Sequence, residues 1–304
     1  MAYLHSDREQ FRDAIDLAYE QTGVMVQAIE KDYYVTMLLR LLAQKMSYIV
    51  FKGGTSLSKC HKVIRRFSED IDITIDTLLS QGQKKKIKQA IVESAEKLGM
   101  TIENLDETRS RRDYNRYVIA YDSVIPMASD ALKAAVLLET SYTAVSFPTV
   151  LLPVHSYIGD MMEQEAPDVI EEYNLNPFEM KVQGIDRTLA DKVFAVCDYY
   201  LQGKVAKHSR HLYDIYKLLP LVPQDENFKE LVKEVRAVRE QSVICPSALP
   251  EADVPELLEK IIKEKAYKQD YDSLTTQLLE ETVPYDTVIA TLKKVAESGL
   301  FENN

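Results

Sequence analysis

The sequence has few cysteines, no long apolar run and no excess of basic residues, and each absence excludes a class of protein. Its three cysteines, Cys60, Cys197 and Cys245, are widely spaced, so we expect reduced thiols rather than a disulfide framework or a zinc cluster. The histidines also lack metal-ligand spacing. No apolar run approaches the ~20 residues of a membrane span, and the N-terminus does not resemble a signal peptide. We therefore expect a cytoplasmic protein without a membrane partner.

Acidic residues outnumber basic ones, 48 to 37, which gives a formal net charge of −11. This balance argues against a generally basic nucleic-acid binder, but it leaves room for a local basic patch. One such group mixes cations with aromatic rings, as RNA-contacting loops do. Its members are Arg109, Arg111, Arg112, Tyr114, Arg116 and Tyr117. An ordinary solvated face is the alternative interpretation.

Patterning predicts sheet and helix in the first half of the 304 residues and almost only helix in the second. The predicted helices cover residues 7–21, 27–45, 77–99, 187–201, 207–219, 226–241, 253–279 and 284–298. Strands are predicted within 48–76, and over 115–123 and 132–142, with Pro148 and Pro153 in a connecting stretch. This order predicts an α+β fold, with a mixed-sheet domain over 1–155 and a mainly helical domain over 156–304.

Residues 48–76 carry the most informative pattern, namely a strand, a double-glycine turn, a short helix and a second strand. Asp70 and Asp72 alternate with isoleucines in the second strand, so both carboxylates point to one face. Two adjacent carboxylates repel each other unless a cation lies between them. Mg²⁺ prefers oxygen ligands and often binds carboxylates together with substrate phosphates. The pattern therefore predicts a metal site.

The turn before this strand suits a phosphate. Gly53 and Gly54 allow close approach of backbone N–H groups, and a helix begins there. Thr55 and Ser56 would add hydroxyls, although capping the helix is a compatible role. Lys59 could reach a phosphate or be a surface lysine. The segment is not a P-loop, because that motif requires a glycine directly before its lysine.

Further candidates come from other segments. Glu139, flanked by apolar residues, is the natural third carboxylate; it would bind metal or accept a proton, unless it is a plain exposed residue. Ser68 would share the strand face of Asp70 and take part in catalysis or self-modification. Lys192 lies on an apolar helix, where a lysine usually snorkels to solvent. Asp214 has an apolar setting and should be paired or functional, with Arg210 as the local partner.

The stretches FKGGTSLSK and RFSEDIDI, in this order, resemble the AbiEii/AbiGii toxins, a branch of the DNA polymerase beta-like nucleotidyltransferases found in abortive-infection and toxin–antitoxin systems. Residues 29–34 (IEKDYY), 188–195 (TLADKVFA) and 210–216 (RHLYDIY) add to the resemblance, which spans roughly residues 25–220.

The resemblance implies a nucleotidyltransferase domain over 1–155 and a helical domain that contributes Lys192 and Asp214. It makes Lys192 a triphosphate ligand, and it gives Asp214 an active-site role, either positioning that lysine or contacting the nucleotide. It also implies Mg²⁺, an NTP substrate, an RNA acceptor such as the 3′ end of tRNA, and a cognate antitoxin.

Three alternatives stay open at this stage: nucleotidylation of a protein or small molecule, a kinase-like reaction, and a nucleotide-sensing module without activity. The sequence does not distinguish among GTP, CTP, UTP and ATP, and the helices after residue 221 carry no motif.

Overall fold

The computed structural model describes residues 2–68, 70–126 and 133–303, which form two compact units. Unit 1 contains Met1–Cys60 and Ser68–Val182, and unit 2 contains His61–Phe67 and Gln183–Asn304. The sequence suggested a boundary between residues 155 and 156. The structure instead groups residues 156–182 with the sheet, and it assigns the short segment between the glycine turn and the aspartate strand to the helical unit.

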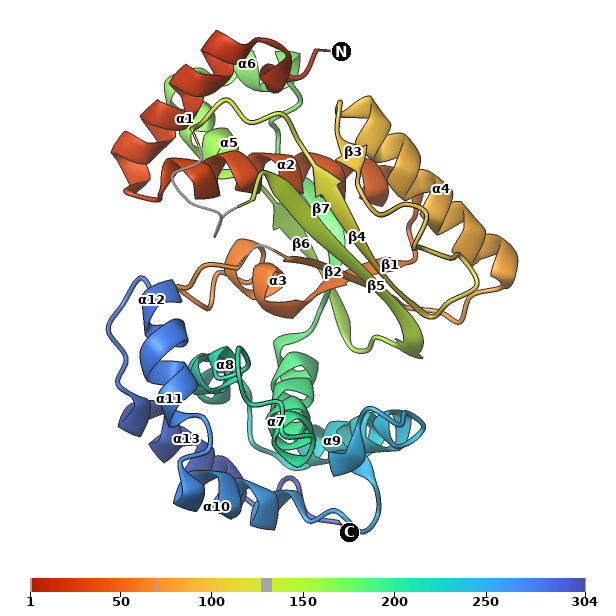
Figure 1. The fold of residues 1–304 in the computed structure, drawn as a ribbon, viewed down its shortest axis with the longest axis vertical. Helices are drawn as coiled ribbons and strands as arrows, with labels where there is room; N and C mark the ends of the chain where they lie inside the picture. The colour runs from red at the N-terminus through yellow and green to blue at the C-terminus, as the bar shows by residue number, and fades with distance from the viewer. Residues whose placement is uncertain (1, 69, 127–132, 304) are drawn as a thin grey trace. The chain divides into compact units, whose positions relative to one another are not determined.

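Unit 1 is built on a seven-stranded mixed sheet in the order β3-β4-β5-β2-β1-β7-β6 (Figure 1). Strand β2 is antiparallel to β1 and parallel to β5, β4 is antiparallel to β5 and β3, and β1 is parallel to β7. The strands are β1 (Ile49–Lys52), β2 (Asp70–Ile75), β3 (Thr101–Ile102), β4 (Tyr114–Ala120), β5 (Ala135–Val145), β6 (Thr149–Val154) and β7 (Phe178–Gln183). This sheet with its flanking helices confirms the predicted α+β class.

Side chains cap the start of helices α1 and α4 in unit 1. The Asp7 carboxylate accepts the Gln10 N–H at the start of α1, and Ser80 forms a capping box with Gln83 at the start of α4. This box explains why the helix predicted from residue 77 begins only at residue 81. The helices are α1 (Arg8–Thr22), α2 (Val26–Lys45), α3 (Gly53–Lys59), α4 (Gln81–Lys97), α5 (Tyr157–Glu165) and α6 (Pro167–Glu172).

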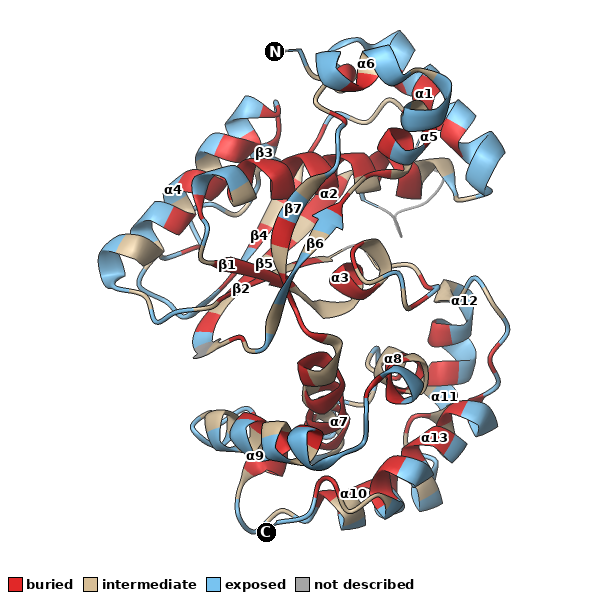
Figure 2. Cartoon of the chain, turned by 180° about the vertical axis from the view of Figure 1, so that it is seen from behind, coloured by how far each residue is buried: buried red, intermediate tan, exposed pale blue. Residues whose placement is uncertain are grey.

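The two faces of the sheet differ in burial, and this difference positions the candidate site. Ile71, Ile73 and Ile75 of β2 join buried side chains of α2 and α4 in one core. The isoleucines alternate with Asp70 and Asp72, which are only half-buried on the other face. In Figure 2, α2 is mostly buried, whereas α4 is buried only along one side. Packing on one face therefore holds the carboxylates on the other.

Some predicted segments of unit 1 differ in the structure. The stretch with Pro148 and Pro153 was expected to be a connection, yet β6 runs through Pro153. This strand is at the edge of the sheet, where a residue without an N–H is tolerated. The strand expected from residue 132 is described from residue 135, and Leu132 itself lies outside the described residues. Helices α5 and α6 and strand β7 were not predicted.

Unit 2 is helical, and α7 (Ile185–Leu201) is buried along much of its length (Figure 2). The other helices are α8 (Arg210–Leu218), α9 (Glu226–Glu240), α10 (Val254–Glu264), α11 (Lys268–Asp270), α12 (Thr276–Leu278) and α13 (Tyr285–Glu297). The single helix predicted over 253–279 is wrong. The chain breaks after Glu264, where Lys265 takes a left-handed conformation with φ 51°, and a π-helical turn covers Tyr271–Thr275.

Within residues 2–68, 70–126 and 133–303, no helix combines the length and the apolar character that crossing a membrane requires.

Candidate active site

A row of charged residues crosses the open face of the sheet in unit 1. Strand register pairs Lys52 of β1 with Asp72 of β2, Asp72 with Glu139 of β5, and Glu139 with Arg116 of β4. Directly paired residues project to the same face, with Cβ atoms roughly 4.5–5.5 Å apart in an antiparallel pair. Asp70 lies on this face two residues before Asp72. Three carboxylates are therefore gathered between a lysine and an arginine.

Glu139 lies beside Asp72, where a third carboxylate was expected. Its side chain is 31% exposed, and its Oε1 lies 3.6 Å from Nε of Arg116. Asp72 and Glu139 are far apart in the sequence, and they lie side by side only because β2 pairs in parallel with β5. Whether Glu139 binds metal or takes a proton stays a prediction.

The glycine turn lies directly against one of these carboxylates. Gly53 has φ +80°, a conformation that side chains rarely adopt, and a Cβ at this position would lie 2.9 Å from Cγ of Asp72 and closer still to its Oδ2. Glycine is thus required twice, for its backbone angle and for the space that the carboxylate fills. The start of α3 and the carboxylate are consequently in contact.

The hydroxyls of the turn donate within unit 1. Thr55 Oγ1 lies 2.6 Å from the carbonyl oxygen of Asp70 and 3.0 Å from Oγ of Ser68, and Ser56 Oγ donates to the carbonyl of Gly53 at 2.9 Å. Both donors are buried. The contacts of Thr55 tie α3 to the strand that carries the aspartates, whereas the bond of Ser56 lies within α3. Phosphate binding by the hydroxyls remains a prediction, as does a catalytic role for Ser68, which lies just before β2.

Lys59, at the end of α3, is engaged inside unit 1. Its ammonium pairs with Oδ1 of Asp32 on α2, and its side chain is only 5% exposed. The other oxygen of Asp32 accepts the N–H of Tyr157, the first residue of α5, at 3.0 Å. Asp32 therefore connects the short helix to two longer ones. This pairing gives Lys59 a structural role, while its predicted phosphate contact remains untested.

Unit 2 contains a buried charge cluster around Asp214. Arg66 donates to this carboxylate through Nε at 2.7 Å and Nη2 at 2.8 Å, and Lys192 Nζ lies 2.6 Å from Oδ2. Asp214 is fully buried, and the lysine side chain is 8% exposed. The expected pair with Arg210 is not formed: among the described residues, the ion pairs of Asp214 go to Arg66 and Lys192.

The charged groups in this cluster shift one another's pKa values. Burial by itself would raise the pKa of Asp214, but the charges of Arg66 and Lys192 outweigh it and hold the pKa well below its usual range. Burial lowers the pKa of Lys192, whereas the carboxylate acts against this. His211, 3.5 Å from Lys192 Nζ, has its pKa lowered well below its ordinary value, first by burial and then by the lysine charge. The imidazole is therefore neutral at pH 7.

Arg66 belongs to a segment that the backbone fixes within unit 2. The N–H of Phe67 donates to the carbonyl of Leu278 at 2.8 Å, and the N–H of Glu280 donates to the carbonyl of Arg65 at 3.1 Å. Arg66 was not predicted as a partner of Asp214. The only notable feature of its sequence context is that it lies close to other basic residues, namely Lys62 and Arg65. Its contact with Asp214 spans 148 positions of sequence.

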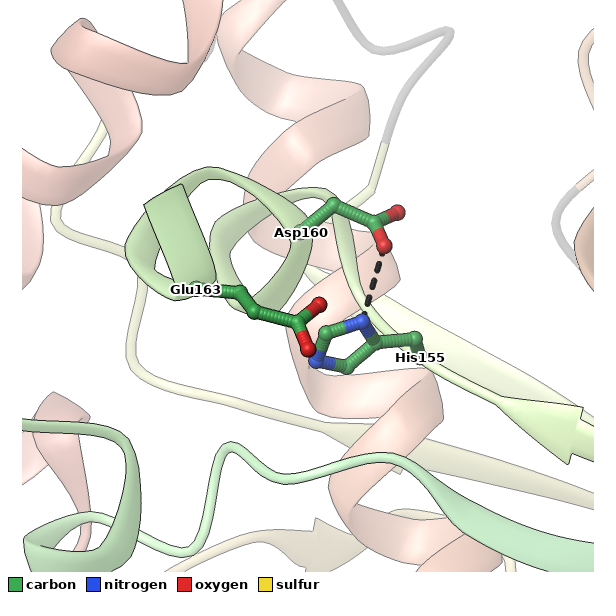
Figure 3. A group of neighbouring side chains, drawn as sticks. All are labelled: His155, Asp160 and Glu163. Atoms are coloured by element: carbon green, nitrogen blue, oxygen red, sulfur yellow. Dashed lines mark hydrogen bonds and ion pairs between the residues drawn. The ribbon is translucent and has the colours of Figure 1, made fainter. Parts of the chain in front are cut away.

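A second cluster in unit 1 has residue types that can bind metal. His155 follows β6, and Asp160 and Glu163 lie on α5 (Figure 3). The ligand atoms of the three residues lie within 4.8 Å of one another. However, Nδ1 of His155 lies 2.8 Å from Oδ1 of Asp160, and Nε2 lies 2.8 Å from the carbonyl oxygen of Leu175. Both ring nitrogens thus lie within hydrogen-bond distance of an oxygen, which explains the cluster as a hydrogen-bonded clamp at the start of α5.

A mixed sheet that gathers three carboxylates, one of them against a glycine turn, suits a nucleotidyltransferase. The chain belongs to the AbiEii nucleotidyl transferase toxins of type IV toxin–antitoxin systems, whose family model matches residues 36–291. Among matching solved structures is MenT4, a nucleotidyltransferase toxin from Mycobacterium tuberculosis H37Rv. It is 16% identical with a TM-score of 0.51, over 93% of this chain and 88% of that one, which is a likeness of fold. No curated protein matches the sequence.

Family membership makes the protein a nucleotidyltransferase toxin. It also implies an NTP substrate and an antitoxin partner.

Proposed function

We propose that the protein transfers a nucleoside monophosphate from an NTP to the 3′ end of an RNA, with tRNA as the acceptor, in a Mg²⁺-dependent reaction. The observation that carries this proposal is the row that brings Asp70, Asp72 and Glu139 together on one open face, with Gly53 against Asp72. Modification of tRNA would block translation, which is a suitable action for a toxin whose antitoxin must restrain it.

The residues present fit a magnesium site. All three carboxylates offer hard oxygen donors, and the missing side chain of Gly53 lets the Asp72 carboxylate lie directly against the glycine turn. Asp70 and Asp72 would hold the metal, and Glu139 would complete the set. When bound, Mg²⁺ neutralises negative charge on the phosphates and stabilises the attacking and leaving oxygens. Lys52 and Arg116, at the two ends of the row, reduce the repulsion among the carboxylates.

In the reaction, the 3′-hydroxyl oxygen of the acceptor attacks the α-phosphorus of the NTP. A new oxygen–phosphorus bond forms, the bond from the α-phosphorus to the bridging oxygen breaks, and pyrophosphate leaves. Glu139 accepts the hydroxyl proton. The backbone N–H groups of Gly54, Thr55 and Ser56 bind phosphate oxygens, since the start of a helix favours negative charge.

Lys192 is proposed as a triphosphate ligand. In its cluster two cations, Arg66 and Lys192, share a single carboxylate, and the neighbouring His211 is neutral. The cluster thus carries one excess positive charge in a buried setting, which favours an anionic ligand. Asp214 is too buried to contact a nucleotide directly, so it acts by positioning the lysine.

The test is to incubate the protein with Mg²⁺, total tRNA and each α-³²P-labelled NTP in turn. Label should enter RNA with one or more NTPs, and Asp70→Asn should abolish it. Asp13→Asn is the matched control, because Asp13 is an exposed acid on α1 of the same unit. Loss of Mn²⁺ binding, measured by calorimetry without nucleotide, together with a wild-type circular dichroism spectrum, separates loss of metal from loss of fold.

Other outcomes would contradict the proposal in distinct ways. Label found on the protein would indicate self-modification, for which Ser68→Ala is the next variant. Transfer of label from γ-³²P-NTP but not from α-³²P-NTP would indicate a kinase. Binding of NTP without any transfer would indicate a nucleotide sensor.

A further inference from the structure

An exposed aromatic side chain lies beside the carboxylate row. Tyr114 is 51% exposed at the start of β4, although an aromatic side chain of this size is usually largely buried. It projects from the same face as Arg116, two residues further on, and Arg116 is paired directly with Glu139. A diagonal neighbour of this kind lies roughly 7–8 Å away between Cα atoms, within reach of an aromatic side chain. The ring therefore borders the proposed reaction site.

The carboxylates form part of the electrostatic environment of Tyr114. Burial raises the pKa of Tyr114, and the charge of Glu139, a hydrogen bond to Glu139 and the charge of Asp72 act in the same direction. About half of the Tyr114 side chain is exposed, so the ring is open to a ligand.

Arg116 complements the ring with a cation. Its side chain is 54% exposed, and Nε lies 3.6 Å from Oε1 of Glu139, so one edge of the guanidinium faces the carboxylate. A guanidinium has five donors in a planar fork, which leaves others for a phosphate. Tyr114 and Arg116 together form what we term the β4 platform.

Three other members of the predicted basic–aromatic group, Arg109, Arg112 and Tyr117, form contacts away from the carboxylates. Nη1 of Arg109 donates to the carbonyl of Thr108 at 2.9 Å, and Nη1 of Arg112 donates to the carbonyl of Glu107 at 3.0 Å. Both arginines thereby hold their own loop. Tyr117 is only 1% exposed and belongs to the core, which corrects its placement among the RNA-contacting candidates. The β4 platform is the part of the group that borders the carboxylates.

We propose that the β4 platform binds the 3′-terminal nucleoside of a single-stranded RNA acceptor, with its base stacked on Tyr114 and its phosphate against Arg116. The sugar hydroxyl then points toward Glu139, the proposed proton acceptor one strand away. Stacking on an aromatic ring suits the unpaired end of an RNA, because every base has a π-face. This inference rests on the proposed function and identifies the side of the site from which the acceptor enters.

The experiment measures binding without catalysis. A short single-stranded RNA with 2-aminopurine at its 3′ end is titrated with the full chain, without NTP or Mg²⁺, and quenching of fluorescence reports stacking. Tyr114→Leu should weaken binding roughly 5- to 150-fold, the range for loss of one stacked base. Tyr114→Phe should stay within about 2-fold of the wild type, since it keeps the ring. Tyr19→Leu, at a similarly exposed tyrosine on α1, should have no effect.

Salt dependence tests the arginine. Arg116→Met should lower the slope of log affinity against log salt by about 0.7, the value for one phosphate contact to a single strand. Unchanged affinity in Tyr114→Leu, with a wild-type circular dichroism spectrum, would overturn the platform. Tyr114-dependent binding without any NMP transfer would instead leave the platform standing and remove the proposed reaction. RNA labelling with an unchanged KM for the acceptor in Tyr114→Leu would instead leave the proposed reaction standing and remove the platform.

Discussion

Replacing Asp214 by asparagine tests the buried charge cluster of unit 2. The substitution keeps the volume and removes the charge, which leaves Arg66 and Lys192 facing each other across a neutral amide. Both oxygens of Asp214 are engaged at 2.6–2.8 Å, and the residue has no exposed surface. Removing one partner of a buried pair typically costs about 3–5 kcal/mol, because it leaves an uncompensated charge. A domain has only about 5–15 kcal/mol of stability in total, so this loss is large.

The assay is urea unfolding followed by far-ultraviolet circular dichroism. Asp214→Asn should lower the free energy of unfolding by about 3–5 kcal/mol at pH 7. Glu259→Gln, at an exposed acid on α10 of the same unit, should change it by less than about 0.5 kcal/mol. Adding Lys192→Met to Asp214→Asn should recover part of the loss, because it removes one of the two unpaired cations.

The pH dependence has a definite sign. The pKa of Asp214 is lower in the folded chain than in the unfolded chain, where the ordinary value is 3.8. Its stabilisation is therefore complete above that value and is lost as the pH falls toward the folded pKa. The difference between wild type and Asp214→Asn should be constant from pH 7 to 5 and should shrink below about pH 4. A loss under about 1 kcal/mol at pH 7, or one that does not shrink in acid, would refute the reasoning.

Three further substitutions probe unit 1. Gly53→Ala should lower transfer activity roughly 100-fold, because the new Cβ displaces the adjacent carboxylate, and Mn²⁺ calorimetry should show weakened binding. Lys59→Met should cost about 3 kcal/mol by urea unfolding, as it leaves Asp32 without its cation; full stability with a raised KM for NTP would instead assign Lys59 to phosphate binding. Ser68→Ala should change stability by less than about 1 kcal/mol, because the Thr55 hydroxyl keeps its 2.6 Å bond to a carbonyl, and an active variant would argue against catalysis by Ser68.

Elements with strong local signals could be predicted from the sequence. Helices α1 and α7 have a cap or apolar periodicity within their own residues, and α2 is a long segment rich in apolar residues. The observed ends of all three lie within a few residues of the prediction. Helix α6 and strand β7 have six residues each, too few for a clear period, and their formation depends on the neighbours they pack against. The break after α10 was missed because Lys265 adopts an angle for which glycine is the usual signal.

The open face of the site was predictable in part. Alternation within β2 is a local property, so Asp70 and Asp72 could be assigned to one face from the sequence. Their proximity to Glu139 depends on which strands pair and in what register, and neither is encoded in either strand alone. Glu139 could therefore be named as a candidate but not located. The pairing of Lys59 with Asp32 could not be predicted either, because it depends on how α3 packs against α2.

The partner of Asp214 illustrates a physical limit on local inference. A helix offers each side chain neighbours at three and four positions along its own surface, which made Arg210 the natural candidate. Such neighbours share the exposure of the helix surface, whereas a fully buried carboxylate points away from solvent and toward other elements. Its charge must then be met by side chains from those elements, as Arg66 and Lys192 do here. The more deeply a charge is buried, the less its partner can be read from adjacent sequence, and the more its loss should cost.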